Sequence, residues 1–277
     1  MSDGTAFGVR DITVRHGERV ALDNVTVDLP AGEVVAVVSG DGAGKSTLLR
    51  ALAREVSTDS GEVRAPGKAD MGFLPAGPGS WAALTVRQNL DFVGGMYGLS
   101  GDLLDRRRDE VIRRAGLQGA VDRLASALSG GMRRKLGAAM AMLHKPRLLL
   151  LDEPSTGVDP VSRIDLWRMI SETAAEGAAV LMSTTYLDEA ERSGHLVVLD
   201  AGHVLVQGSY DDVREGFRGV VTVGDTAVRP EWSWRRGRRR HEYWPEGDPP
   251  PDAEPLQPDL EDIVIAASLE RRSGVPQ

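Results

Sequence analysis

A short glycine-rich segment, Ser39–Thr47, contains the residue types with the clearest chemistry in this 277-residue chain. It reads Ser-Gly-Asp-Gly-Ala-Gly-Lys-Ser-Thr and lies between an apolar run at 34–38, which predicts a strand, and helical apolar spacing over 45–56. Glycines in such a turn let consecutive backbone N–H groups and the following helix N-terminus point at phosphate oxygens. We therefore expect a phosphate-binding loop. The alternative is a glycine-rich turn that binds no ligand.

The positions of this loop have distinct expected roles toward a nucleoside triphosphate and its metal ion. Lys45 would reach the β and γ phosphates, and the Ser46 hydroxyl would coordinate Mg²⁺. Ser39 departs from the usual motif, which has glycine six positions before the lysine. The predicted nucleotide-binding positions in the loop are Gly40, Asp41, Gly42, Ala43, Gly44, Lys45, Ser46 and Thr47.

An apolar run that ends in two carboxylates supplies the second group of candidate residues. Leu148–Leu151 is followed directly by Asp152 and Glu153. Asp152 is expected to complete the Mg²⁺ shell, and Glu153 is expected to point at the water that attacks the γ phosphate. An ordinary acidic exit from a buried strand is the alternative. Because a phosphate-binding loop precedes the pair in the same chain, we predict nucleotide hydrolysis with Glu153 and Lys45 as catalytic residues.

The segments around these motifs predict an α/β fold. Alternating apolar and polar residues in the first 30 positions indicate antiparallel strands with a turn at His16–Glu18. Further along, helical segments alternate with apolar runs at 148–151, 179–183 and 196–199. This alternation favours a mostly parallel sheet flanked by helices. The strand-poor stretch 77–145 is expected to be a helical insertion.

The composition of the sequence changes after about residue 216. Short strands are expected at 220–223 and 226–228, and the proline-rich stretch 245–258 is expected to be a semi-rigid linker. Helical spacing then returns over 260–269. We expect these segments to form a small C-terminal extension.

Five arginines within 235–240 lie among Trp232, Trp234 and Trp244. Basic and aromatic residues together suit phosphates and stacked bases, which makes nucleic-acid binding one interpretation. The interpretation that we favour is a hairpin whose arginines pair with the seven acids between Glu246 and Asp262.

Composition narrows the class of protein. With 33 basic and 41 acidic residues the net charge is −8, which argues against a dedicated polyanion binder. The absence of cysteine excludes disulfides and thiolate metal sites. No apolar run approaches the roughly 18 to 20 residues that cross a bilayer, and the first residues lack a basic and apolar leader. We therefore expect neither a membrane span nor a secretory signal.

A third motif, Leu-Ser-Gly-Gly-Met at Leu128–Met132, precedes a predicted helix at 133–143. With the glycine-rich loop and the acidic strand end, it makes the chain resemble the nucleotide-binding subunits of ATP-binding-cassette (ABC) transporters over about residues 5–215. The helix at 260–269 resembles the terminal helix of drug-resistance-type exporter ATPases.

The resemblance implies a P-loop NTPase core with a mixed, mostly parallel sheet and antiparallel N-terminal strands. We predict a nucleotide-binding domain at 1–216, with its helical subdomain at about 77–145, and a C-terminal extension at 217–277. The implied function is that of an ATPase that uses MgATP to power transport, with export as the expected direction.

The resemblance also implies partners and a location. In this family ATP binds between two subunits, so Ser129, Gly130 and Gly131 would bind in trans the γ phosphate of ATP held by the other subunit. Gly157–Asp159 resembles the loop that crosses this dimer interface. The implied partners are membrane-spanning transporter subunits and a second ABC ATPase subunit, and the expected location is the cytoplasmic face of the cell membrane, as a peripheral subunit.

Three positions depart from the family pattern. Ala76 stands where a glutamine normally contacts Mg²⁺ and the attacking water, and Thr185 stands where a switch histidine precedes Tyr186. His16, before Gly17, occupies the place of the aromatic residue that stacks on adenine, where imidazole would stack less area; a plain turn residue is the alternative. The departures imply a degenerate site in an asymmetric heterodimer whose other chain has the glutamine and the histidine.

Two other functions stay open at this point. One is a soluble ABC protein that acts on nucleic acid or ribosomes, although such proteins usually contain two cassettes in one chain. The other is an ATP clamp that hardly hydrolyses its nucleotide, which Ala76 and Thr185 support.

Overall fold

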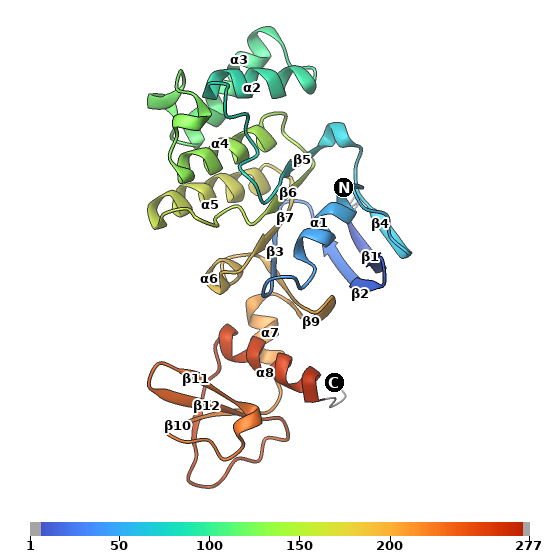
Figure 1. The fold of residues 1–277 in the computed structure, drawn as a ribbon, viewed down its shortest axis with the longest axis vertical. Helices are drawn as coiled ribbons and strands as arrows, with labels where there is room; N and C mark the ends of the chain where they lie inside the picture. The colour runs from blue at the N-terminus through green and yellow to red at the C-terminus, as the bar shows by residue number, and fades with distance from the viewer. Residues whose placement is uncertain (1–6, 274–277) are drawn as a thin grey trace.

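The structure, a computed structural model, describes residues 7–273, and these form a core, a helical insertion and a C-terminal unit stacked along the long axis of the molecule (Figure 1). Within the described residues, no helix combines the length and the apolar character needed to cross a membrane. Residues 1–6 and 274–277 lie outside this description, so the expectation that the first residues contain no secretory signal concerns a segment outside the described residues.

A small antiparallel sheet begins the core. It has the order β2-β1-β4, formed by β1 (Phe7–His16), β2 (Arg19–Leu29) and β4 (Ser60–Arg64). The chain reverses between β1 and β2 at Gly17, whose φ of 63° lies in the left-handed region that glycine adopts without strain. The predicted antiparallel N-terminal strands and their turn are confirmed.

The main sheet has six strands in the order β5-β6-β7-β3-β8-β9. All neighbours pair in parallel except β8 and β9, so the predicted mixed, mostly parallel sheet is confirmed. Its strands are β3 (Val34–Val38), β5 (Met71–Leu74), β6 (Leu148–Asp152), β7 (Ala179–Thr184), β8 (His195–Asp200) and β9 (His203–Gly208). Because β3, β6 and β7 are consecutive in this order, the segments that follow their carboxyl ends meet at one edge of the sheet.

The two faces of the main sheet pack against different layers. Val35 and Val37 of β3 point into a core shared with the small sheet and with α1 (Lys45–Leu52). Val34 and Ala36 point to the opposite core, which the insertion helices share with α5 (Pro160–Ala175). The core is completed by α6 (Leu187–Ala190) and α7 (Tyr210–Gly216). α1 ends before the predicted Val56, because Arg54 adopts a left-handed φ of 56°.

The insertion between β5 and β6 contains α2 (Val86–Met96), α3 (Gly101–Arg114) and α4 (Gly130–Met142), with short 3₁₀ turns at Gln118–Ala120 and Ala125–Ala127. A further 3₁₀ turn, Lys68–Asp70, precedes β5. Thr85 begins α2 in a capping box, because its hydroxyl accepts from the backbone N–H of Gln88 while the Gln88 side chain accepts from the Thr85 N–H. The predicted helical character of this stretch is confirmed.

The C-terminal unit is a four-stranded antiparallel sheet with one helix packed on it (Figure 1). The strand order is β11-β12-β10-β13, and α8 contributes Ala266 to a small core with Val221 and Tyr243. The Arg271 side chain joins α8 to the core, since Nη1 lies 2.9 Å from Asp200 Oδ2. The elements are β10 (Val220–Gly224), a 3₁₀ turn at Pro230–Trp232, β11 (Ser233–Arg236), β12 (Arg239–Trp244), β13 (Glu254–Leu256) and α8 (Leu260–Ser273).

Two expectations for this unit are wrong. Residues 226–228 form no strand, because the backbone N–H groups of Val228 and Arg229 donate to the buried carboxylate of Glu242, at 2.9 and 2.6 Å, instead of to a ladder. The proline-rich stretch is more than a linker, because β13 pairs with β10 and Leu256 packs on the small core. Pro255 is tolerated there because β13 is an edge strand.

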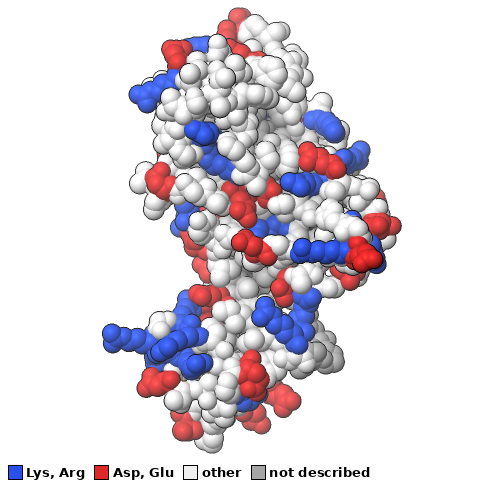
Figure 2. Space-filling model, in the orientation of Figure 1, with Lys and Arg blue, Asp and Glu red and all other residues white. Residues whose placement is uncertain are grey.

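The arginine-rich segment forms the hairpin of β11 and β12, as predicted. Arg236 lies 2.6 Å from Asp259 and 3.2 Å from Glu261, and Arg239 lies 2.8 Å from Glu254. Figure 2 shows basic side chains gathered on the C-terminal unit, at the lower left, with acidic side chains beside them. For these two arginines, pairing with acids of the same unit is confirmed.

Because this local pairing offsets part of the basic charge, we expect no appreciable affinity of the full chain for nucleic acid. The dissociation constant for single-stranded DNA or RNA at physiological salt should be no tighter than about 10⁻⁴ M, the weak end of non-specific binding. A triple change of Arg235, Arg238 and Arg240 to glutamine should leave it unchanged in a fluorescence anisotropy titration. Micromolar, salt-dependent binding that the triple change removes would contradict this expectation.

Candidate nucleotide-binding site

The glycine-rich loop connects the carboxyl end of β3 to the first turn of α1. Gly42 and Gly44 have φ values of 76° and 114°, and residues with a Cβ rarely adopt this backbone conformation. A Cβ on Gly44 would also lie 2.7 Å from the carbonyl oxygen of Ala21 in β2. The loop conformation therefore requires glycine at these positions, and α1 begins directly behind it at Lys45.

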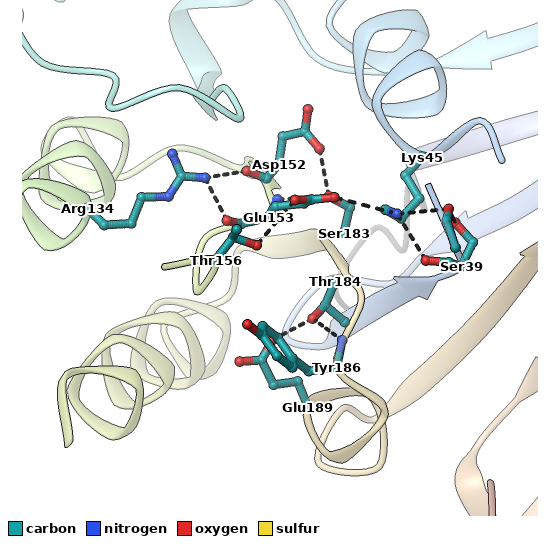
Figure 3. A network of polar contacts seen from close by, with 11 residues as sticks. Ser39, Lys45, Arg134, Asp152, Glu153, Thr156, Ser183, Thr184, Tyr186 and Glu189 are labelled. Carbon is teal, nitrogen blue, oxygen red and sulfur yellow. Dashed lines mark hydrogen bonds and ion pairs between the residues drawn. The ribbon is translucent and has the colours of Figure 1, made fainter. Parts of the chain in front are cut away.

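Lys45 lies at the centre of this arrangement and is 5% exposed. Its Nζ donates to the carbonyl oxygens of Ser39 at 3.0 Å and Gly40 at 3.2 Å, and lies 3.5 Å from Glu153 Oε1 (Figure 3). A buried ammonium held mainly by carbonyl dipoles attracts an anion strongly, because little water screens it. The loop thus holds its positive charge in place before any ligand arrives.

Asp152 and Glu153 lie at the end of β6 and are joined to β7 by one hydroxyl. Ser183, which pairs with Asp152 across the sheet, donates from Oγ to Asp152 Oδ1 at 2.7 Å and accepts from the backbone N–H of Glu153 at 2.8 Å. Glu153 adopts a left-handed φ of 50°, and the Thr156 hydroxyl donates to its Oε2 at 3.2 Å. Ser183 therefore orients both predicted acidic residues (Figure 3).

These residues surround a hollow of about 290 Å³. His16 lies at its edge, with Nε2 3.4 Å from the Thr47 hydroxyl. Arg19, which sequence reasoning missed, donates from Nη2 to the Gly42 carbonyl at 3.2 Å. Its place at the start of β2, directly after the His16–Glu18 turn, was the available signal. The lining residues are His16, Arg19, Ala21, Asp41, Gly42, Gly44, Lys45, Ser46, Thr47 and Glu153.

The structure thus brings most of the predicted nucleotide-binding residues to one place. Gly40, Ala43 and Asp152 are not among the residues that line the hollow. The Gly40 carbonyl faces Lys45 Nζ, Ala43 is buried, and Asp152 is 1% exposed beneath Glu153. Ala43 and Asp152 therefore lie behind the lining residues, whereas Gly40 is exposed.

The Ser-Gly-Gly segment lies elsewhere, at the N-terminus of α4. The Ser129 hydroxyl accepts from the Met132 N–H at 3.2 Å and caps the helix, while Ser129 and Gly130 are exposed. None of Ser129, Gly130 and Gly131 lines the hollow. A Cβ on Gly131 would lie 3.2 Å from Asp159 Oδ2, so this helix start is a neighbour of the 157–159 loop. An exposed helix N-terminus suits an anion supplied by another molecule.

Comparison with known proteins identifies the family. The family model described as ABC transporter matches residues 22–156. The daunorubicin resistance ATP-binding protein DrrA3 of Streptomyces coeruleorubidus is 32% identical over 225 residues, which cover 77% of this chain and 71% of that protein. The chain belongs to the ABC transporter family. This confirms the resemblance predicted from the three motifs.

Two more ABC proteins are similar to this chain. The Nod factor export ATP-binding protein I of Cupriavidus metallidurans is 32% identical over 80% of this chain and 78% of its own length. The probable multidrug ABC transporter ATP-binding protein YbhF of Escherichia coli is 37% identical over 69% of this chain. The match covers only 35% of YbhF, so the chain spans about a third of that relative's length.

Solved structures confirm the predicted fold class. An ATP-binding subunit of an ABC transporter has a TM-score of 0.71 and 29% identity, over 77% of this chain and 93% of that one. A dimeric ATP-binding cassette bound to ADP and Pi shares the fold, with a TM-score of 0.65 and 22% identity over 73% of this chain and 97% of that one.

Two of the three positions that depart from the family pattern, Ala76 and Thr185, are exposed. Ala76 follows β5, and Thr185 follows β7. The preceding residue, Thr184, is buried and donates to Glu189 Oε2 at 2.6 Å (Figure 3). Ser155 donates to the same carboxylate oxygen at 2.8 Å. Glu189 therefore ties the end of β7 to the turn after the acidic pair, a contact that the sequence did not indicate.

The residues present fit a magnesium ion that arrives with a nucleotide. Among the described residues, no group of three or more histidine, cysteine or acidic side chains could hold a metal ion alone. Mg²⁺ usually takes one or two carboxylates together with phosphate oxygens and water. The Ser46 hydroxyl in the hollow and the Asp152 carboxylate fixed by Ser183 match that donor set.

Proposed function

We propose that the chain is the ATP-binding subunit of an ABC transporter that exports its substrate through separate membrane subunits. The observation that carries the proposal is the meeting of the glycine-rich loop, Lys45 and Glu153 around one hollow, with Asp152 directly behind. The names of two relatives, which refer to daunorubicin resistance and Nod factor export, support export as the direction.

Each predicted residue has a role in this proposal. The backbone of 40–47 and the Lys45 ammonium bind the phosphates, and Ser46 and Asp152 hold Mg²⁺. Glu153 orients the attacking water. His16, beside Thr47, contacts the adenine base. Phosphoryl transfer to water depends on positioning and charge stabilisation more than on covalent chemistry, and these side chains supply both.

The site of this chain is proposed to be the weak one of an asymmetric heterodimer. Ala76 has no polar side chain, and a threonine hydroxyl at 185 is too short to replace an imidazole. Losing one preorganised transition-state donor typically costs about 10² to 10³ in rate. Both losses fall on this chain's own site, whereas Ser129, Gly130 and Gly131 are intact for the site of a partner ATPase that has the glutamine and the histidine.

Membrane-spanning subunits are proposed to dock on the helical insertion, which holds the chain at the cytoplasmic face of the membrane as a peripheral subunit. Trp81 is 44% exposed and packs edge-on against Phe92, which is 49% exposed, at 4.7 Å between ring centroids. Met96 and Leu103 are further exposed apolar residues of the same insertion. An exposed group of large apolar side chains suits a partner surface.

Replacing Lys45 with alanine tests the nucleotide site. Hydrogen bonds to a charged group are worth about 1.5 to 3 kcal/mol, so loss of the ammonium should weaken MgATP binding by about 10- to 100-fold. Isothermal titration calorimetry on the full chain gives the dissociation constant. Lys68→Ala is the control, because Lys68 is exposed and lies outside the hollow. Equal affinities for the two variants would contradict the assignment of the hollow to ATP.

A further inference from the structure

Arg134 of α4 is a buried arginine that joins two separate loops. It is 6% exposed, and its guanidinium donates to six backbone carbonyl oxygens. Three belong to the loop after β5: Pro75 at 2.8 Å, Ala76 at 3.3 Å, and Gly77. Three belong to the end of β6 and the turn after it: Asp152, Glu153 at 2.8 Å, and Pro154 at 3.1 Å (Figure 3).

The electrostatics of this arginine are unusual for a buried cation. In the part of the chain that the structure describes, its hydrogen-bond partners are backbone carbonyls rather than carboxylates. Burial lowers the pKa of Arg134 below its ordinary value, while the charges of Asp152 and Glu153 act in the opposite direction. A buried guanidinium is costly unless it is fully hydrogen-bonded. The contacts of Arg134 therefore hold the loop after β5 and the turn after β6 in fixed positions.

The guanidinium geometry matters for what Arg134 can do. Its five N–H donors lie in a rigid planar fork, so one side chain can hold both loops at a fixed separation. Nη1 donates to carbonyls of the loop after β5, whereas Nη2 and Nε donate to carbonyls at the end of β6 and in the turn after it. A lysine ammonium has its three N–H donors on one nitrogen and cannot span both loops.

The three segments that Arg134 joins have different proposed roles. The α4 helix presents Ser129, Gly130 and Gly131 at its start. The end of β6 and the turn after it contain Asp152 and Glu153 of the nucleotide site. The loop at 75–77 leads into the proposed docking surface at Trp81. A helix is stiff over the few residues between its N-terminus and Arg134, so a displacement at Arg134 also moves that N-terminus.

We propose that Arg134 is a positioning residue that couples the acidic turn of the nucleotide site to the Ser-Gly-Gly helix and to the loop at 75–77. MgATP bound in the hollow orders Asp152 and Glu153, and the guanidinium transmits that ordering to both other segments. In a dimer, occupation of this chain's site thereby sets the position of the Ser-Gly-Gly segment in the partner's site. The inference rests on the proposed function for the identity of the ligand.

Hydrogen–deuterium exchange of the full chain, with and without MgATP, tests the coupling independently of hydrolysis. In the wild type, MgATP should slow exchange at least about tenfold in peptides covering 39–47, 71–77 and 129–133. In Arg134→Lys and Arg134→Gln, protection should persist over 39–47 and disappear from the other two segments. A thermal unfolding curve for each variant monitors folding.

The neighbouring arginine provides a matched control on the same helix. Arg133 donates to the carbonyls of Ala125 and Ser126, at 3.1 and 3.2 Å, and these contacts lie within the insertion. Arg133→Gln should therefore keep the wild-type pattern of protection in all three segments. Loss of the remote protection in this variant would show that any disturbance of α4 has the same effect, which would overturn the specific role of Arg134.

The remaining outcomes separate the coupling from the proposed function. If Arg134→Gln unfolds, Arg134→Lys, which keeps the charge, decides the result. Remote protection that survives in Arg134→Lys overturns the coupling, as does wild-type protection confined to 39–47. Absence of protection at 39–47 in the wild type would instead contradict the nucleotide site, and the coupling would fall with it.

Discussion

Replacing Ser129 with arginine is expected to stop ATP hydrolysis by the assembled transporter, whereas Glu153→Gln in the same chain should change the steady-state rate little. The contrast follows from the proposed asymmetry. Ser129 serves the partner's site, which is expected to cycle, and Glu153 serves this chain's own site, which lacks the glutamine and the histidine. A symmetric pair of active sites would respond strongly to both changes.

The local structure explains why an arginine at 129 should be so damaging. Ser129 caps α4 with its hydroxyl, and the exposed N–H groups behind it form the expected anion site. An arginine side chain removes the cap, adds bulk where the γ phosphate must approach, and puts a positive charge at the positive end of the helix dipole. We expect the rate of phosphate release to fall by at least about 10² to 10³.

The measurement is phosphate release by the purified complex at saturating MgATP. Ser126→Arg is the matched control, because Ser126 is exposed three positions earlier in the chain but, unlike Ser129, does not cap the N-terminus of α4. That variant should retain nearly full turnover. If Glu153→Gln alone abolishes hydrolysis, this chain's site is catalytic after all, and residues other than Ala76 and Thr185 supply the missing contacts.

The nucleotide site was predictable where its chemistry is local in sequence. The loop at 39–47 contains its glycines, its lysine and the start of the following helix within nine residues, so the spacing indicates the conformation and predicts a phosphate ligand. The acidic pair was equally visible, because a wholly apolar strand that ends in two carboxylates is unusual. Both segments lie at one edge of the mostly parallel sheet, after β3 and at the end of β6, with β7 between these two strands.

The contacts that the sequence did not indicate join residues far apart in the chain. Ser183 reaches Asp152 because β7 pairs with β6 in a register that places the two opposite each other. Arg134 reaches the loop after β5, almost sixty positions earlier, through the packing of α4 against that strand. Periodicity defines which face of an element is buried, but neither strand register nor helix packing can be read from one segment alone.

The C-terminal unit shows the same limit in another form. Proline-rich composition indicated a linker over 245–258, yet Glu254–Leu256 pairs as an edge strand, because Val221 and Val223 of β10 offer it a partner. Similarly, Thr226–Val228 has strand-like composition, but the Glu242 carboxylate binds the N–H groups at its end. In both cases a contact with a residue or strand elsewhere in the chain determines the backbone hydrogen bonding and overrides the local propensity.

Replacing Trp81 with aspartate is expected to abolish assembly with the membrane subunits and leave the isolated chain folded. The indole is nearly half exposed, whereas the backbone beneath it is held by another residue. The buried Asn89 side chain accepts from the Trp81 N–H at 2.8 Å and donates to the Trp81 carbonyl at 3.1 Å. Loss of the indole therefore leaves the loop with its backbone hydrogen bonds.

The size of the expected effect comes from the role of aromatic anchors in interfaces. Truncation of such a residue commonly costs 2 kcal/mol or more, about 30-fold or more in affinity, and an aspartate adds the cost of burying a charge. Co-purification with tagged membrane subunits, and sedimentation of the chain with membranes when these subunits are co-expressed, both report assembly. Neither signal should remain above background for Trp81→Asp.

A matched substitution separates docking from a general loss of solubility or fold. Val228 is 68% exposed on the C-terminal unit, remote from the insertion, so Val228→Asp adds the same charge at an apolar surface position without touching the docking surface. It should assemble normally. If Trp81→Asp lowers the unfolding temperature of the isolated chain together with assembly, the indole packs within the insertion against Phe92, and the membrane subunits must dock elsewhere.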